Sequence, residues 1–296
     1  MTNNVKGIFL ALLSSFCAVL MSVFLKYAQE DSNVYTVGFM RFFFGFILIL
    51  PFIFKSKFKI YKTNNLKFHI TRCIINVPMM ILGFSALMYI PLEQIKAIGF
   101  LSPIFVVILS VIFLNERIYL IRTFSLLLGF VGVMIILRPG IIDVSIGAYM
   151  VLASTLLWST IVLITKYMSK SDSAMTIITY QYTLVTLFTL PFAFIYWSNI
   201  TILSVFYTFM AAIVGTVLHL AINFSYKIAP LSVLQPIWFT QLLWATFFSL
   251  FLFAEESLNY FTYIGGTLVF ISVLIITYRE NYLKKDVAKN SILLKN

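Results

Sequence analysis

The stretch FLKY (residues 24–27) ends the first long apolar run of the chain, and ITKY (residues 164–167) ends a similar run in the second half. Further residues repeat at this same offset, which slips by one position later in each half. A repeat of this length indicates two copies of one structural unit. The other matched positions are Gly7 with Gly147, Ser14 with Ser154, Pro51-Phe52 with Pro191-Phe192, Pro91-Leu92 with Pro230-Leu231, and Glu116 with Glu255.

Each copy is predicted to contain five membrane-spanning helices. Because five is an odd number, the second copy must enter the membrane from the side opposite to the first. Inverted repeats of this kind build a substrate site near the middle of the bilayer. We therefore expect a first repeat over residues 1–140, a second repeat over residues 141–280, and a basic cytoplasmic tail over residues 281–296.

The composition favours lipid as the solvent of the chain. Hydrophobic residues make up 61%, charged residues 10%, and the mean hydropathy is +1.00, which leaves too little polar surface for a water-soluble protein of 296 residues. The net charge of +11 does not predict nucleic-acid binding, because the basic residues form short tracts between apolar runs. Cys17 and Cys73 fall in or beside apolar runs and are expected to pack as small hydrophobic side chains.

Ten apolar runs are long enough, at roughly 20 residues each, to cross about 30 Å of hydrocarbon. The predicted fold is therefore an all-α integral membrane protein of ten transmembrane helices, arranged as two inverted five-helix repeats. Pro91 and Pro230 each follow a very tight turn and are expected in the first turn of the next helix. The predicted spans are residues 5–27, 34–54, 70–90, 92–114, 119–138, 146–168, 174–196, 201–227, 231–253 and 259–278.

Lysine and arginine gather on one side of these spans, and such a bias marks the cytoplasmic side. Both termini are therefore expected in the cytoplasm. The opposite side carries Glu30, Asp31, Asp143, Glu255 and Glu256. The basic residues assigned to the cytoplasmic side are Lys6, Lys55, Lys57, Lys59, Lys62, Lys67, Arg72, Arg117, Arg122, Lys166, Lys170, Lys227, Arg279, Lys284, Lys285, Lys289 and Lys295.

The repeat, the span number and several short motifs resemble the EamA-type branch of the drug/metabolite transporter superfamily. This resemblance implies transport of amino acids, nucleotide derivatives, drugs or other metabolites. The second copy has Gln181 where the first has Arg41, so the copies do not contribute the same basic group. The run from Arg41 to Phe44 is similar to a branch that takes up S-adenosylmethionine. The motifs are the Lys-Tyr pairs, Met40-Arg41-Phe42, Leu114-Asn115-Glu116-Arg117 and Gly129-Phe130-Val131-Gly132.

Arg41 is the first candidate for the site, because an arginine at membrane depth usually faces a bundle interior or a wet cavity. It either contacts substrate or serves as a structural group that forms an ion pair or snorkels to the interface. Glu93 can pair with Lys96, one turn further on, or it can reach Arg41. Glu93 is thus a candidate gate or anchor.

Other polar side chains within the spans are candidates for substrate contact or for hydrogen bonds between helices, which are worth about 0.6 kcal/mol on average. His219 and Asn223 are four residues apart and share a helix face. Trp238 is the aromatic most strongly expected in a pocket, because it follows the kink predicted at Pro236, whereas single aromatics otherwise serve mainly in packing. The remaining candidates are Asn76, Gln94, Gln181, Gln235, Gln241, Trp158, Tyr180 and Trp244.

Other unusual residues have structural explanations. Pro78 and Pro103 are expected to kink their helices, as at Pro236. Small residues permit close helix approach, and acidic or basic residues stabilise the positive or negative end of a helix. The glycines concerned are Gly129, Gly132, Gly265 and Gly266, and the helix-end charges are Lys26, Lys166, Glu116 and Glu255.

Enzymatic chemistry finds no support, since the sequence has no phosphate-binding loop and no ligand cluster with metal spacing. No cofactor, no metal and no nucleic acid is expected. We expect a secondary transporter of the bacterial inner membrane, surrounded by lipid, that works by alternating access around a cavity lined by helices 1, 3, 4, 6, 8 and 9. The predicted substrate is a small organic metabolite, with amino acids and their derivatives first and S-adenosylmethionine second.

Without a site for ATP, a coupling proton or an exchanged solute must drive transport, and His219 could carry such a proton. A lipid or lipid-carrier flippase and a non-transporting structural membrane protein are the alternatives from other classes. The sequence leaves open import or export and the oligomeric state.

Overall fold

The structure, a computed structural model, describes residues 3–102, 104–106, 109, 120–138, 144–229, 234, 237–238, 240–252, 260–272 and 274–275. Within these residues every regular element is a helix, which confirms the predicted all-α class. The helices are α1 (Asn3–Ala28), α2 (Val34–Lys55), the 3-10 helix η1 (Lys59–Tyr61), α3 (Leu66–Ala86), α4 (Leu92–Gly99), α6 (Leu120–Leu137), α7 (Ile146–Met168), α8 (Ala174–Ile195), α9 (Ile202–Ile228), α11 (Thr240–Leu252) and a further helix over Tyr260–Ser272.

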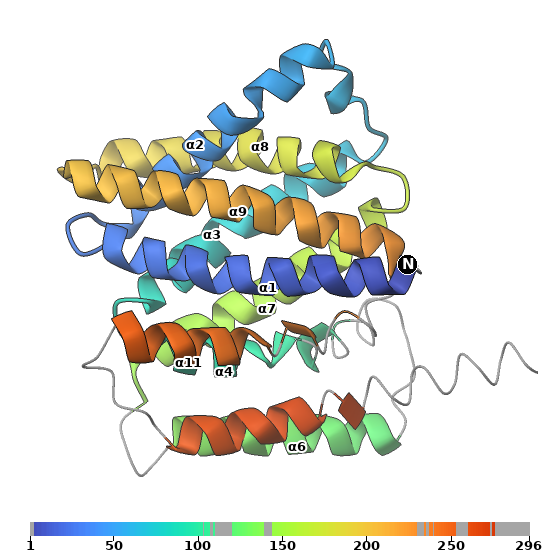
Figure 1. Cartoon of the computed structure of the whole chain (residues 1–296), viewed down its shortest axis with the longest axis vertical. Helices are drawn as coiled ribbons and strands as arrows, with labels where there is room; N and C mark the ends of the chain where they lie inside the picture. Colours follow the sequence, from blue (N-terminus) through green and yellow to red (C-terminus); the bar gives the residue numbers. More distant parts are fainter. Residues whose placement is uncertain are drawn as a thin grey trace, which may run out of the picture.

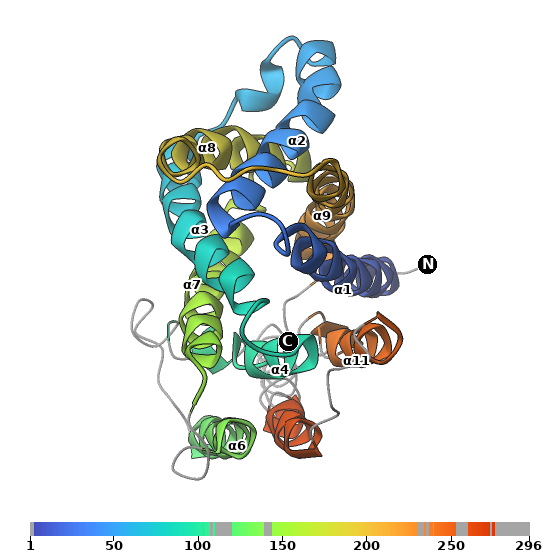
Figure 2. The same cartoon turned by 90° about the vertical axis from the view of Figure 1, so that its left-hand side faces the viewer.

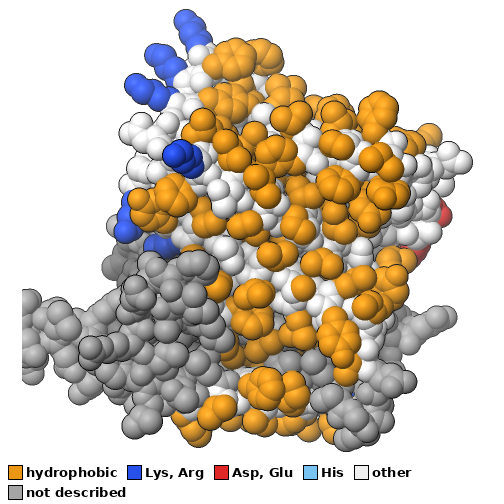
Figure 3. All heavy atoms as spheres, turned by 180° about the vertical axis from the view of Figure 1, so that it is seen from behind, with side chains coloured by type: hydrophobic (Ala, Val, Ile, Leu, Met, Phe, Trp, Pro, Cys, Tyr) orange, Lys and Arg blue, Asp and Glu red, His pale blue; other side chains and the backbone are white. Residues whose placement is uncertain are grey.

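Six helices among the described residues, α1, α2, α3, α7, α8 and α9, are long and apolar enough to cross a membrane. Each corresponds to a predicted span. The other four predicted spans contain the shorter apolar helices Gln94–Val106, Leu127–Ile136, Leu243–Leu252 and Tyr260–Ser272. Figure 3 shows a continuous hydrophobic face, with basic side chains at one edge and acidic ones at the opposite edge, as expected for a protein surrounded by lipid.

Side-chain caps determine where several helices begin. Asn33 precedes α2 and accepts a hydrogen bond from the backbone N–H of Thr36 (2.9 Å). Ser173, at the matching position of the second half, precedes α8 and accepts from the N–H of Thr176 (3.0 Å). Such caps satisfy backbone donors that the first turn of a helix leaves free. The two copies thus start their second helices in the same way.

The third helix corrects the predicted boundaries. It begins at Leu66 rather than at residue 70, and it continues through Pro78 to Ala86. Arg72, which the charge pattern counts with the cytoplasmic-side residues at the start of the predicted span, therefore lies deeper inside the helix and is only 2% exposed. Pro91 is the residue before the first turn of α4 rather than within it. The expected features at Pro103, Pro230 and Pro236 and the helix-end charges Glu116 and Glu255 lie outside the described residues.

Helices from the two halves of the chain pack against each other. α1 lies beside α9, α3 beside α7, and α2 crosses α8, as Figures 1 and 2 show. α4 contacts α7 and α11. In the end-on view of Figure 2, α2 and α8 occupy one end of the cross-section and α6 the other. The pairs α1–α9 and α3–α7 are the same pair with the halves exchanged.

Glycines bring α6 and the helix Tyr260–Ser272 into backbone contact. A methyl group added at Gly132 would lie 2.7 Å from the carbonyl oxygen of Gly265, and one added at Gly265 would collide with the carbonyl oxygen of Gly132. The predicted role of these glycines in close helix approach is therefore confirmed.

Two polar clusters fasten loops of one half to loops of the other, at opposite ends of the bundle. In the Asp172 cluster, Oδ2 of Asp172 accepts hydrogen bonds from Thr63 (2.9 Å), Asn65 (3.2 Å) and Nε2 of His69 (2.9 Å). In the Asp31 cluster, Thr201 donates to Asp31 at 2.9 Å. Asp172 is 6% exposed, whereas Asp31 is exposed to solvent.

Lys166 stabilises a neighbouring helix end as well as standing in the last turn of its own helix, α7. Its Nζ donates to the carbonyl oxygens of Tyr226 (2.6 Å) and Ala229 (3.2 Å), at the end of α9. A cation at carbonyls left free by the end of a helix is favourable. The predicted capping role extends here to the partner helix.

Candidate functional site

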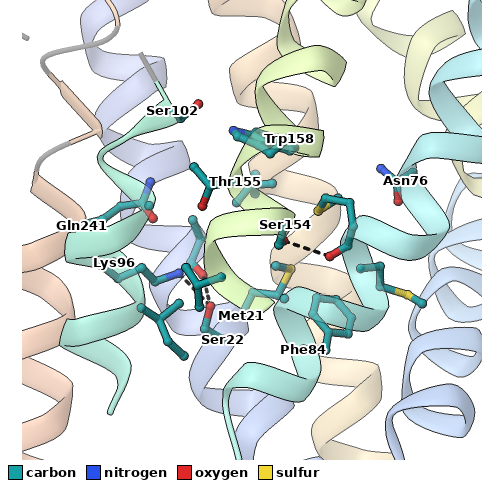
Figure 4. Close-up of a pocket in the computed structure, with 18 of the residues that line it drawn as sticks. Met21, Ser22, Asn76, Phe84, Lys96, Ser102, Ser154, Thr155, Trp158 and Gln241 are labelled. Atoms are coloured by element: carbon teal, nitrogen blue, oxygen red, sulfur yellow. Dashed lines mark hydrogen bonds between the residues drawn. The ribbon is translucent and has the colours of Figure 1, made fainter. Parts of the chain in front are cut away.

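A cavity lies inside the bundle between helices of both halves. Its empty volume is about 1350 Å³, part of which is open to solvent. The predicted lining spans 1, 3, 4, 6, 8 and 9 correspond to α1, α3, α4, α7, α9 and α11 with Trp238, and all of them contribute. α2 and α8, the second and seventh spans, contribute as well. Figure 4 shows polar side chains from α1, α3, α4, α7 and α11 around this space. A cavity between the helices of a bundle is a usual place for a small-molecule site.

Four buried polar side chains from four helices form a continuous chain. Nη2 of Arg41 lies 3.3 Å from Nε2 of His219, and Nε2 of Gln181 lies 3.2 Å from the same atom. Oε1 of Gln181 accepts a hydrogen bond from Nη2 of Arg72 (2.8 Å). Arg41, His219 and Gln181 line the cavity, and Arg72 stands behind Gln181.

The geometry fixes the protonation pattern of His219. Arginine has donors only, so Nε2 of His219 must accept from Arg41. The amide nitrogen of Gln181, also a donor only, shares the lone pair of Nε2 with Arg41, while the carbonyl oxygen of Gln181 accepts from Arg72. His219 is therefore a neutral imidazole with its proton on Nδ1.

Two cations reach consecutive residues of α1 at the cavity. Arg41 donates to Sδ of Met21 (3.2 Å). Nζ of Lys96 donates to Oγ of Ser22 (2.9 Å), and Figure 4 draws this second bond. Both partners are uncharged. Between residues that the structure describes, the one ion pair joins His69 and Asp172, so no described carboxylate neutralises Arg41, Arg72 or Lys96.

Aromatic and hydroxyl groups form the rest of the wall. The guanidinium of Arg41 lies 4.4 Å from the ring centre of Phe42, and Trp158 meets Trp238 edge to face at 6.3 Å. Ser154 donates to the carbonyl oxygen of Met79 at 2.9 Å (Figure 4). The arrangement combines a flat apolar surface with a positively charged side.

The structure brings together many of the predicted site residues. Arg41, Asn76, His219 and Trp238 line the cavity, and so do Gln181, Gln241 and Trp158. Oδ1 of Asn76 is buried without a hydrogen-bond partner among the described residues.

Other predicted residues lie elsewhere. The described wall of the cavity does not include Gln94 or Asn223. The described wall also lacks Tyr180, which stacks on His69 at 4.3 Å, and Trp244, which packs against Phe16 at 5.2 Å. Gln235 and the side chain of Glu93 lie outside the described part of the chain, and with them the predicted contacts of Glu93 with Arg41 and Lys96.

Sequence reasoning misses two contributors. The charge pattern counts Arg72 only as a cytoplasmic-side charge, although the predicted span 70–90 contains it and its position four residues before Asn76 puts both on one helix face. Lys96 is predicted as a partner for Glu93 rather than as a group facing the cavity. The described residues contain no group of three or more His, Cys, Asp or Glu side chains that could hold a metal ion.

The chain is similar to known transporters along almost its whole length. A model of the EamA-like transporter family matches residues 5–138 and again residues 145–278. An S-adenosylmethionine uptake transporter of Rickettsia bellii is 26% identical over 95% of this chain and 94% of its own length. A riboflavin transporter of Vibrio cholerae is 29% identical over 68% of each chain.

A solved crystal structure has the same fold. It superposes with a TM-score of 0.65 over 95% of this chain and 98% of its own, at 12% identity. An identity this low supports the fold alone.

Proposed function

We propose a transport function on the premise that this chain belongs to the EamA-like transporter family. The family and the named relatives indicate a transporter of small molecules rather than an enzyme. The apolar helices and the bacterial relatives together indicate a bacterial membrane protein. Within that frame the protein moves a small organic metabolite across the inner membrane by alternating access. Amino acids and their derivatives are the first candidates.

One observation carries this proposal. Arg41 and Lys96 are positively charged groups held at a cavity inside a bundle of membrane-length helices. Placing charge at such depth is costly unless it serves a pathway or a ligand. A purely structural membrane protein has no use for two cations beside an aromatic wall, and a lipid or lipid-carrier flippase is distinguished by the experiment below.

Two inverted five-helix repeats with both termini in the cytoplasm are part of the proposal. The sequence repeat between the two halves, the exchanged pairs α1–α9 and α3–α7, and the two loop clusters at opposite ends support this arrangement. In such transporters the halves rock against each other around a central site. Energy comes from an ion gradient or from exchange of a second solute.

S-adenosylmethionine is the second candidate, because several relatives are named as its uptake transporters and are similar to this chain over more than nine-tenths of their length. Riboflavin belongs in the same test, because another group of relatives is named for it.

Counterflow in proteoliposomes tests the proposal. Liposomes containing the purified chain are preloaded with unlabelled amino acids, S-adenosylmethionine or riboflavin, and uptake of the matching labelled solute is followed. We expect transient accumulation for at least one solute, and none in empty liposomes. Accelerated exchange of a labelled lipid between leaflets, without counterflow of any water-soluble metabolite, would replace this function by that of a flippase.

A further inference from the structure

We infer that the cavity recognises a carboxylate group of its substrate through Arg41 and Lys96. This inference rests on the proposed function, because it takes the cavity to be the transport site. It adds the chemical group that the site recognises, and it assigns this recognition to the side of the cavity that carries Arg41 and Lys96.

The first step is geometric. Met21 and Ser22 are consecutive residues of α1, and they receive donors from Arg41 and Lys96 respectively. Arg41 comes from α2 and Lys96 from α4, so α1 holds both cations at one level of the cavity. All four side chains line the same space.

The second step concerns unused hydrogen-bonding capacity. A guanidinium has five N–H donors and an ammonium has three. Among the described residues, the guanidinium of Arg41 donates through Nη2 to Met21 and His219, and Lys96 donates to one hydroxyl. These acceptors are neutral, so the positive charge is not compensated by any described side chain.

The third step concerns the ligand. A carboxylate accepts several hydrogen bonds and neutralises a cation, and a charge-assisted bond is about twice as strong as a neutral one. Trp158 and Trp238 cover another part of the wall and suit an apolar or flat body attached to that carboxylate. The site therefore fits an organic acid with an apolar part better than an uncharged molecule of similar size.

The experiment uses tryptophan fluorescence and does not require knowledge of the natural substrate. Replacing Trp197 and Trp244 by phenylalanine leaves Trp158 and Trp238 as the only tryptophans of the four in the chain. The purified full-length variant is titrated with iodide and with caesium. We expect iodide to quench about tenfold more effectively, because a positive cavity concentrates anions.

Two ligand probes then identify the group. Phenylacetate should protect the two tryptophans from iodide, whereas phenylacetamide, which has the same shape and no charge, should not. Equal protection by both probes would overturn the inference, and so would equal quenching by iodide and caesium. Protection by phenyl phosphate alone would also overturn it, because the group would then be a phosphate.

Matched variants locate the effect. Lys96→Met and Arg41→Gln should each lower the iodide-to-caesium ratio at least about twofold. Arg41→Lys retains the charge and should keep the ratio, which guards against a folding defect at this buried position. Lys67→Met removes an exposed lysine outside the cavity wall and is the control. Unchanged ratios in both Lys96→Met and Arg41→Gln would remove these residues from the site.

Failure of the inference and failure of the proposed function are distinguishable. If counterflow succeeds with an uncharged solute and phenylacetate gives no protection, the protein is a transporter with another mode of recognition. If phenylacetate protects and no solute is exchanged, the carboxylate site exists without transport.

Discussion

Arg41 and His219, 178 residues apart in the sequence, meet through Nη2 and Nε2 at 3.3 Å inside the bundle. Gln181, which occupies the position of Arg41 in the other half of the chain, reaches the same imidazole nitrogen. The departure of the second copy from the first therefore has a geometric consequence. One side chain supplies charge, the other supplies a link to Arg72, and His219 joins them.

The role of His219 is tested by the pair His219→Ala and His219→Gln. Alanine leaves the buried donors of Arg41 and Gln181 without an acceptor, and we expect a loss of about 1–3 kcal/mol in unfolding free energy. Glutamine supplies an acceptor oxygen and should recover most of the loss. Chemical denaturation in detergent measures both.

The same pair bears on proton coupling. Because Nε2 is already occupied by two donors, a proton can add there only after those contacts break. Uptake by His219→Gln that keeps its affinity and its pH dependence would eliminate His219 from the substrate site and from coupling. Lost pH dependence with retained binding would establish it as the coupling group.

The bond between Arg72 and Gln181 should appear as energetic coupling. We expect Arg72→Met and Gln181→Leu to destabilise the protein individually, and the double variant to be less damaged than their sum by about 1–3 kcal/mol. Denaturation of the four proteins gives the coupling energy. Additive losses would show that this buried hydrogen bond contributes no free energy.

The Asp172 and Asp31 clusters predict different responses to the same substitution. Asp172→Asn weakens three hydrogen bonds at a buried oxygen, and we expect a loss of about 2 kcal/mol. Asp31→Asn affects an exposed bond, and its loss should stay below about 1 kcal/mol. Thermal unfolding compares the two, and equal losses would refute this ranking.

The glycine contact between Gly132 and Gly265 predicts a steric effect. Gly132→Ala places a methyl group 2.7 Å from a backbone oxygen, and we expect a lower midpoint of thermal unfolding. Gly99→Ala is the control, because an added methyl group there meets nothing within 4 Å. A destabilised control with an unaffected Gly132→Ala would contradict the packing.

Topology is tested by labelling. Cys17 and Cys73 are buried and free, and their replacement gives a cysteine-free background. A cysteine at the exposed Asn199 should react with an impermeant reagent from outside, and one at the exposed Lys170 should not. Tags at Lys6 and Lys295 should both report the cytoplasm. Labelling at Lys170 alone, or a periplasmic C-terminal tag, would remove the inverted arrangement.

Hydrophobic length is sufficient to predict six spans, because a membrane-crossing helix needs a long apolar run wherever it packs. The predicted span 70–90 contains Arg72, but the charge pattern counts Arg72 with the cytoplasmic-side residues, because a basic residue near a helix start has the same local sequence as a loop charge. Its bond to Gln181 depends on the packing of α3 against α8, which periodicity does not encode.

Residues of the cavity can be predicted from the sequence where depth within an apolar run is a sufficient indication. Arg41, Asn76 and His219 are polar groups well inside apolar runs, and all three reach the cavity. Asn223 shares a helix face with His219 but is not part of the described wall of the cavity, although Tyr226, further along the same helix, is. Tyr180 instead packs on His69 of another helix and donates to the carbonyl oxygen of Tyr61, which is the packing role expected for most single aromatics.

Both loop clusters are formed at once, at the two ends of the side of the bundle where α2 and α8 cross. Hydrogen bonds at both ends of this side oppose opening of the bundle there toward either compartment. If the halves rock, α2 and α8 lie along the axis of rotation, and the largest displacement falls on α4 and α11 at the far side of the cavity. Lys96 stands on α4 and would travel with it, whereas Arg41 on α2 stays near the axis. The distance between the two cations would thus increase and decrease once in each transport cycle, with Lys96 moving and Arg41 nearly fixed.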